Sequence, residues 1–200
     1  MLAPGATLLH AFALDQDSGL LAAVHAIAAA APFRQWRIPG GLSMSVAMTN
    51  CGSVGWVSDR RGYRYQTTDP SSGEPWPAMP PIFRELAQAA AAAAGFAGFS
   101  PDACLVNRYL PGTRMSLHQD KDESDFNAPI VSVSLGLPAI FQFGGDTRST
   151  KPLRIPLQHG DVVVWGGAAR LRYHGVAPLK AGQHPLVGGR RLNLTFRRAL

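Results

Sequence analysis

The chain has 200 residues, of which 46% are hydrophobic and 16% are charged. This composition suits a folded domain and excludes an intrinsically disordered chain. Lys and Arg number 19 against 13 Asp and Glu, so the formal charge of +6 allows a polyanionic partner, although a charge that serves only solubility is an equal alternative.

The first predicted element is a helix that runs from just after Asp17 to Ala31. Its apolar residues recur at helical spacing, acidic residues stand at its start, and a proline follows its end. A second helix is predicted from about Pro81 to Ala94, with Gly95 just past its end. We expect both helices to buttress the outside of the fold.

The segment between the helices, about residues 39–80, is rich in Gly and Pro. Only two short extended pieces are predicted in it, at residues 43–48 and 63–67. A stretch this irregular inside a small domain is typical of a functional lid or loop. We therefore expect a lid here, at one side of a more regular core.

From residue 102 onward the pattern changes to short strands separated by turns. Strands at this spacing, with Gly or Pro between them, indicate an antiparallel sandwich or barrel. We expect one α+β domain over residues 1–200, mainly β, in which a double-stranded β-helix, or jelly roll, occupies about residues 102–198. The predicted strands are residues 103–110, 116–118, 130–135, 139–143, 154–157, 161–165, 171–174 and 191–196.

The last predicted strand has two faces of opposite character. Apolar side chains alternate along it with a polar face that carries Arg191, Asn193 and Arg197. Asn107 and Tyr109 share one face of the strand at 103–110 in the same way. A face exposed to water is one interpretation. The other is an enclosed cationic face that binds the carboxylates of a dicarboxylate cosubstrate.

Two tripeptides have the form His-X-Asp, which places an imidazole and a carboxylate on one side of a strand. With a distant histidine such as His174, either could complete the two-His, one-carboxylate set that holds non-haem Fe(II). His118-Gln119-Asp120 leads into a polar segment, Lys121-Asp122-Glu123, where ligand could enter. His159-Gly160-Asp161 leads into an apolar strand. Spacing alone leaves both open, and the surroundings favour the first.

Cysteine content and hydropathy bear on the compartment. Cys51 and Cys104 are too few for a disulfide framework, which favours a reducing cytosol. The longest apolar stretch, around residues 89–97, falls short of the roughly 20 residues that span a bilayer, and no export signal opens the chain. We expect a cytoplasmic monomer without a membrane segment.

A resemblance to a known family rests on residues 32–35, 44–52, 76–80, 101–105, 117–123, 129–145, 159–167 and 193–197. These segments resemble bacterial AlkB, a family of Fe(II)- and 2-oxoglutarate-dependent dioxygenases that repair alkylated nucleobases. The similarity spans roughly residues 30–198. The first 30 residues match weakly, and the loop at 146–151 differs from the family pattern.

The resemblance implies roles for the candidate residues. The iron ligands would be His118, Asp120 and His174, which selects the first His-X-Asp tripeptide. The residues that hold 2-oxoglutarate would be Asn107, Tyr109, Arg191, Asn193 and Arg197. The nucleotide-recognition lid would contribute Trp56, Tyr63, Arg64 and Tyr65. The base pocket would be completed by Met48, Asp122 and Arg148, the last of which lies in the divergent loop.

The activity implied by the resemblance is oxidative demethylation of N1-methyladenine and N3-methylcytosine in single- or double-stranded DNA, with RNA as a further substrate. It uses Fe(II), O₂ and 2-oxoglutarate and releases formaldehyde, succinate and CO₂. Two alternatives stay open. One is a related oxygenase that acts on a small molecule, lipid or protein, against which the aromatic and basic segment 56–65 argues. The other is a binding protein that only uses metal for stability.

Overall fold

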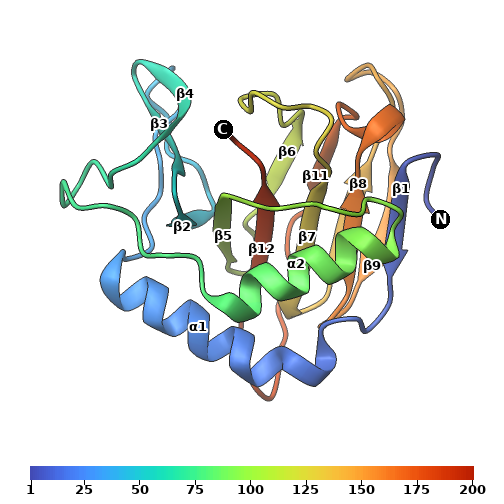
Figure 1. The fold of residues 1–200 in the computed structure, drawn as a ribbon, viewed down its shortest axis with the longest axis horizontal. Coiled ribbons are helices and arrows are strands. Elements are labelled where there is room, and N and C mark those ends of the chain that lie inside the picture. The colour runs from blue at the N-terminus through green and yellow to red at the C-terminus, as the bar shows by residue number, and fades with distance from the viewer.

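The computed structural model describes residues 1–200 and is built mainly from two antiparallel sheets (Figure 1). The larger sheet has the order β1-β10-β7-β12-β5-β2, with strands Ala6–Leu9, Val162–Trp165, Ile130–Gly136, Arg191–Arg197, Ala103–Tyr109 and Ala47–Gly52. The smaller sheet has the order β6-β11-β8-β9, with strands Met115–His118, His174–Val176, Ala139–Phe143 and Leu153–Leu157. The predicted fold class, a jelly roll with two helices, is confirmed.

The inner faces of the two sheets pack against each other. Phe141 and Phe143 of the smaller sheet approach Trp165 of the larger sheet, with ring centroids 5.9 and 6.4 Å apart. Together with other apolar side chains they form a buried cluster of 21 residues. The polar pocket described below opens within the same layer, so its walls belong to both sheets.

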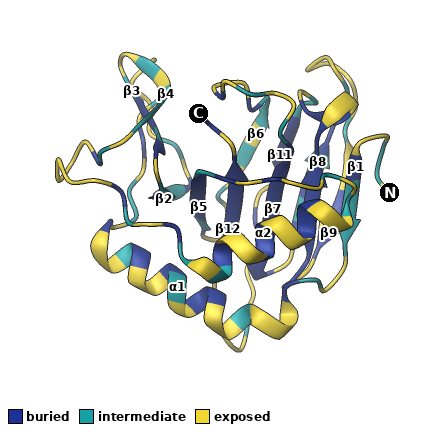
Figure 2. Ribbon diagram, in the orientation of Figure 1, coloured by how far each residue is buried: buried dark blue, intermediate teal, exposed yellow.

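The two helices cover the outer face of the larger sheet (Figure 1). Helix α1 (Asp17–Ala30) and helix α2 (Pro81–Ala93) end within one residue of their predicted ends. Figure 2 shows that each helix is buried on the side toward the sheet and exposed on the other. Phe83 of α2 meets Phe196 of β12 edge to face, at a ring distance of 5.7 Å. No helix has the length and apolar character that a membrane crossing requires.

The strand predictions were wrong in detail at several places. Strands β1 and β3 (Gly55–Asp59) were not predicted; β1 is four residues long, and its partner β10 lies about 155 residues further along the chain. The strand predicted at 171–174 is instead β11, His174–Val176, and residue 171 belongs to a turn after a short 3-10 helix. The extended piece predicted at 43–48 forms an isolated bridge between Ser43 and Arg37 and joins a strand, β2, only at Ala47.

The predicted irregular segment carries a separate two-stranded ribbon, which stands apart from the two sheets (Figure 1). It consists of β3 (Gly55–Asp59) and β4 (Gly62–Gln66). Asn50 of β2 donates to the backbone oxygen of Trp56 and accepts from its N–H, both at 3.0 Å. The ribbon is therefore tied to the larger sheet, while Arg60 and Arg61 at its turn are exposed.

Candidate active site

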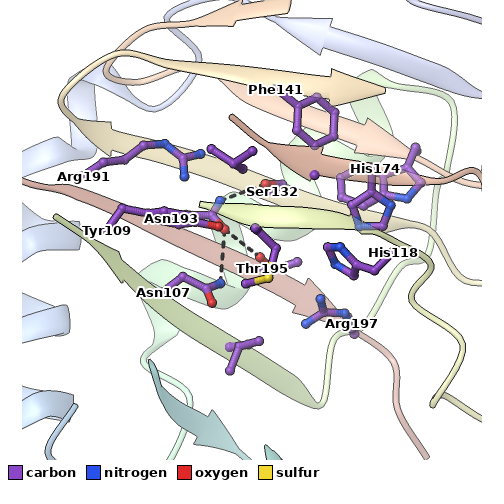
Figure 3. Close-up of a pocket in the computed structure, with 15 residues that line it drawn as sticks. Asn107, Tyr109, His118, Ser132, Phe141, His174, Arg191, Asn193, Thr195 and Arg197 are labelled. Carbon is purple, nitrogen blue, oxygen red and sulfur yellow. Dashed lines mark hydrogen bonds between the residues drawn. The ribbon is translucent and has the colours of Figure 1, made fainter. Parts of the chain in front are cut away.

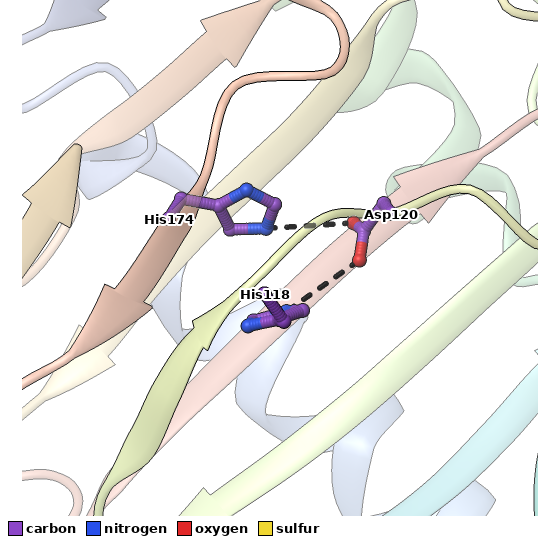
Figure 4. A group of neighbouring side chains, drawn as sticks. All are labelled: His118, Asp120 and His174. Atoms are coloured by element: carbon purple, nitrogen blue, oxygen red, sulfur yellow. Dashed lines mark ion pairs between the residues drawn. The ribbon is translucent and has the colours of Figure 1, made fainter. Parts of the chain in front are cut away.

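Pairing between two strands brings the candidate metal ligands together. His118 ends β6 and His174 begins β11, and the two residues are direct partners in the smaller sheet. Asp120 follows two residues after His118, with its carboxylate oxygens 3.5 Å from Nε2 of His118 and 3.7 Å from Nε2 of His174 (Figure 4). One ligand atom from each side chain lies within 4.8 Å of the others. A single ion fits between them.

Backbone carbonyl groups set the orientation of both imidazoles. Nδ1 of His118 lies 2.8 Å from the carbonyl oxygen of Ser116, and Nδ1 of His174 lies 3.0 Å from that of Arg172. A carbonyl oxygen only accepts, so each Nδ1 carries the proton and donates it. The lone pairs of both Nε2 atoms are then free and face Asp120, as ligation requires.

The charges at this cluster also suit a cation. Burial and, to a smaller extent, the neighbouring His118 lower the pKa of His174 to about 4, so His174 is neutral at pH 7. Burial alone would raise the pKa of Asp120, but Arg197 and the two histidines outweigh this and hold it well below its usual range. The cluster therefore offers the ring of His118, the neutral imidazole of His174 and one carboxylate.

A pocket lies directly beside the cluster, between the two sheets (Figure 3). Strand register places Arg191 opposite Tyr109 and Asn193 opposite Asn107, so two adjacent strands present these four side chains to one space. The apolar residues of β12 pack on the helix side of the same sheet instead. The predicted alternation of the last strand is confirmed as an enclosed polar face.

Arg191 is the most unusual side chain of the pocket, because it is 1% exposed and incompletely paired. One terminal nitrogen donates to Ser134 Oγ at 2.9 Å, and the guanidinium lies 5.0 Å from the ring centroid of Tyr109. Its Nε and other terminal nitrogen have no partner. A buried donor without a partner costs about 1–3 kcal/mol. A carboxylate in the pocket would accept from an unpaired nitrogen of this guanidinium, which suits 2-oxoglutarate.

The floor of the pocket is a chain of amides and hydroxyls (Figure 3). Asn193 donates to Ser132 Oγ at 2.8 Å, and its oxygen accepts from Asn107 at 3.2 Å and from Thr195 at 3.0 Å. Thr195 lies on the polar face that alternation predicts for the last strand, but Ser132 was missed in the sequence. The signal for Ser132 was there, because Ser132 and Ser134 interrupt an otherwise apolar buried strand.

Arg197 lines the pocket but is turned toward the metal cluster. Its Nε and one terminal nitrogen donate to Asp120 Oδ2 at 3.0 and 2.7 Å. Its Nε also lies 3.2 Å from Glu123. Glu123 was expected in a polar rim, but it is 6% exposed, so that expectation was wrong for this residue.

In the second His-X-Asp tripeptide, hydrogen bonds within the protein engage the side chains of both His159 and Asp161. Asp161 accepts hydrogen bonds from two backbone N–H groups at 2.9 and 2.8 Å. His159 Nδ1 accepts from the N–H of Gly136 at 2.8 Å, and its Nε2 lies 3.1 Å from Asp17. No ligand atom is free to meet an ion. As its surroundings indicated, this tripeptide forms the turn that starts a core strand.

One predicted lid residue, Trp56, contacts the segment that follows the metal cluster. Trp56 stacks on Tyr63 with ring centroids 5.5 Å apart, and its indole N–H donates to Asp122 at 2.8 Å. Arg64 is engaged elsewhere, in a two-pronged pair with Asp59 at 3.0 and 2.8 Å.

The remaining predicted substrate residues lie in three different settings. The Tyr65 hydroxyl donates to Glu123 at 2.7 Å. Met48 is 1% exposed and belongs to the apolar cluster rather than to the pocket lining. Arg148 is exposed in its loop and forms no ion pair or side-chain hydrogen bond. The structure thus brings Trp56, Tyr63 and Asp122 together but leaves Met48 and Arg148 apart from them.

Together, a jelly roll with two histidines and a carboxylate at its mouth defines a non-haem iron oxygenase. The chain belongs to the 2OG-Fe(II) oxygenase superfamily, whose family model matches residues 5–197. It is a dioxygenase that uses Fe(II) as its metal and 2-oxoglutarate and O₂ as cosubstrates.

Relatives of known name extend this assignment. The chain is 59% identical over 198 residues to the alpha-ketoglutarate-dependent dioxygenase AlkB of Salmonella typhimurium and to that of Escherichia coli, across 99% of this chain and 92% of each relative. It is 33% identical over 173 residues, 74% of this chain and 38% of the relative, to the DNA N(6)-methyladenine demethylase ALKBH1C of Arabidopsis thaliana. The solved structure of OsALKBH1 superposes with a TM-score of 0.87 at 30% identity, covering 99% of this chain and 98% of that one.

Proposed function

We propose that the chain acts as one oxidative demethylase domain that removes methyl groups from the ring nitrogens of nucleobases in nucleic acid. When bound, Fe(II) and 2-oxoglutarate supply the oxidising chemistry, which couples loss of CO₂ to hydroxylation of an N-methyl group and its release as formaldehyde. The observation that carries the proposal is the juxtaposition of three elements. One pocket is lined by His118 and His174 of the metal cluster and by the incompletely paired Arg191, and Trp56 of the lid donates to Asp122, two residues beyond Asp120.

The proposed metal ligands are His118 and His174 through Nε2 and Asp120 through a carboxylate oxygen. Three protein ligands leave the remaining positions of an octahedral ion open for cosubstrate and O₂. The hydrogen bonds of both Nδ1 atoms to backbone carbonyls hold the rings in place before the metal binds. The protein's part is thus to orient the ligands and to keep the imidazole of His174 neutral.

Arg191 is the proposed anchor for the distal carboxylate of 2-oxoglutarate. Its unpaired N–H groups can donate to a carboxylate, and the arrangement is buried, so the ion pair is weakly screened. The cosubstrate would lie along the pocket floor, in contact with Asn107, Tyr109 and Asn193. Arg197 would act at the metal end, where it already holds Asp120.

The lid over residues 39–80 is proposed to recognise the nucleotide. Methylation at N1 of adenine or N3 of cytosine weakens base pairing, which lowers the few kcal/mol needed to flip the base out of the stack. Trp56 supplies an aromatic face, and stacking on such a face contributes about 1–3 kcal/mol per base. The same methylation makes the base cationic, so the exposed carboxylate of Asp122 next to Trp56 favours it.

The charge and the relatives support nucleic acid as the substrate class. The exposed arginines of the ribbon turn, Arg60 and Arg61, can meet phosphates, whereas Arg64 is committed to Asp59. A relative named for DNA demethylation matches across 74% of the chain. We further propose that the protein acts as a monomer in the cytoplasm, which agrees with its two unpaired, buried cysteines.

The test is formaldehyde release from a singly methylated oligonucleotide, with Fe(II) and 2-oxoglutarate supplied. Formaldehyde in amounts equal to the succinate formed supports the proposal. Succinate with some other substrate class, and none with the oligonucleotide, would favour an oxygenase acting on a small molecule, lipid or protein. No turnover with any substrate, despite bound iron, would favour a binding protein.

A further inference from the structure

Behind the candidate metal site lies a cluster of four charged side chains: Asp120, Glu123, Arg170 and Arg197. Each is between 3% and 9% exposed, and the two carboxylates balance the two guanidinium groups. Charges this deeply buried are retained only when they are paired and hydrogen-bonded. Only Asp120 and Arg197 have a role in the function proposed above, so Glu123 and Arg170 need an explanation.

Arg170 holds the segment that follows β6. Its guanidinium donates to the backbone oxygens of Asp120 at 2.7 Å and Ala128 at 3.1 Å, and to Glu123 Oε2 at 3.1 Å. This segment contains no helix or strand, so these bonds replace the missing regular structure. Arg170 therefore determines where the backbone of the candidate metal ligand lies.

Glu123 connects the lid to the same ligand. One of its oxygens accepts from the Tyr65 hydroxyl at 2.7 Å and lies 3.2 Å from Nε of Arg197. Burial raises the pKa of Tyr65, so the hydroxyl keeps its proton and donates. Arg197 in turn donates twice to Asp120 Oδ2. A continuous chain of hydrogen bonds thus joins β4 of the lid to Asp120.

This arrangement distinguishes the two oxygens of Asp120. Oδ2 accepts both bonds from Arg197, whereas Oδ1 accepts no hydrogen bond and lies 3.5 Å from Nε2 of His118. A carboxylate that binds through one oxygen occupies one position on the ion. That leaves one more position open than a carboxylate that binds through both.

We propose that Glu123 and Arg170 are positioning residues. They hold Arg197 and the backbone of Asp120 so that one carboxylate oxygen faces the metal, and they link this geometry to the lid through Tyr65. The inference rests on the proposed role of Asp120 as a ligand. Because coupling between two sites is reciprocal, metal binding should steady the lid, and a closed lid should strengthen metal binding.

The first measurement uses Co(II) as the probe in the full chain, with its visible absorption as the readout of coordination geometry. Glu123→Gln and Arg170→Lys are expected to weaken Co(II) binding about 10- to 100-fold, as loss of outer-shell partners does, and to change the spectrum. Asp125→Asn is the matched control. It alters a carboxylate of the same segment, which lies 4.0 Å from the surface residue Arg198, and should leave both readouts unchanged.

The second measurement separates the lid from the metal. In the wild type, Co(II) should increase the protection of residues 55–66 against hydrogen exchange. Tyr65→Phe removes one hydroxyl and should reduce that increase, while Co(II) affinity falls less than in Glu123→Gln. This variant, with Arg170→Lys, decides the matter if Glu123→Gln does not fold.

The outcomes are distinguishable from those of the proposed function. Wild-type affinity and spectrum in both Glu123→Gln and Arg170→Lys would overturn the positioning role. Equal protection of residues 55–66 in wild type and Tyr65→Phe would overturn the link to the lid. If Asp120→Ala bound Co(II) as well as the wild type, the metal assignment itself would fail.

Discussion

The two His-X-Asp tripeptides of this protein have the same form but opposite surroundings. His118 and Asp120 direct their free ligand atoms toward a third residue, His174, beside a pocket with unpaired donors. His159 and Asp161 use theirs on backbone N–H groups. The first arrangement leaves hydrogen-bonding capacity for ligands, and the second uses it to hold a turn. A metal site is therefore recognised by atoms that the fold leaves free.

The largest effect is expected from removing the carboxylate of His118-Gln119-Asp120, the tripeptide whose ligand atoms are free. Asp120→Ala should lower the rate of succinate formation on the order of 1,000-fold, more than the 10- to 100-fold typical of outer-shell partners, because a direct ligand is lost. Asp161→Ala, assayed under conditions where it stays folded, should retain wild-type Co(II) affinity. Comparable losses of Co(II) affinity in Asp120→Ala and Asp161→Ala would remove the distinction between the tripeptides.

His159-Gly160-Asp161, whose side chains are hydrogen-bonded within the protein, should matter for stability instead. Asp161→Ala leaves two backbone N–H groups without an acceptor, at about 1–3 kcal/mol each, so the free energy of unfolding should fall by about 2–6 kcal/mol. Urea unfolding followed by circular dichroism measures this. A loss below about 0.5 kcal/mol would mean that water replaces the carboxylate readily.

The unpaired donors in the pocket beside His118 and His174 can be tested through Arg191. Arg191→Lys keeps the charge but loses the planar fork, so the Kd for 2-oxoglutarate should rise about 10- to 100-fold, or roughly 1.4–2.8 kcal/mol. Calorimetric titration with Co(II)-loaded protein gives this constant. Arg190→Lys, on the opposite side of the chain, serves as the control, and an equal effect in both would contradict the assignment.

The smallest expected effect is on the pH dependence of stability, at the pair between Asp17 and His159 of the second tripeptide. Hydrogen bonds from His159 and Ser18 hold the pKa of Asp17 below its ordinary value of 3.8. A carboxylate with a lowered folded-state pKa stabilises the fold above its unfolded pKa, and this contribution is lost as the pH falls through the folded value. Asp17→Asn should therefore reduce the slope of unfolding free energy against pH below about pH 4. Identical slopes in variant and wild type would show that the pair adds nothing.

Much of the site was predictable from local geometry. Because strand side chains alternate, residues 191, 193 and 197 could be assigned to one face from the sequence, and the structure places them in one pocket. The helices were also predictable, since apolar spacing and flanking Pro and Gly mark their ends. Family resemblance added what alternation could not, namely which of the two His-X-Asp pairs binds the metal.

Other features could not be predicted because they depend on residues far apart in the chain. Glu123 stands in a polar run that resembles a surface, yet Arg170, 47 positions later, buries it in a salt bridge. Strand β1 becomes a strand only because β10 lies beside it. We expected Arg64 to contact the substrate, but its guanidinium is paired with the carboxylate of Asp59.

The sequence by itself determined which side chains share a face, since that follows from backbone periodicity within a single strand. It also supplied two chemically equivalent His-X-Asp tripeptides. Only the tertiary structure decided between them on physical grounds, because the meeting of His118 with His174 requires β6 and β11 to pair. The same packing leaves the Nε2 atoms of one tripeptide free and engages both ring nitrogens of the other.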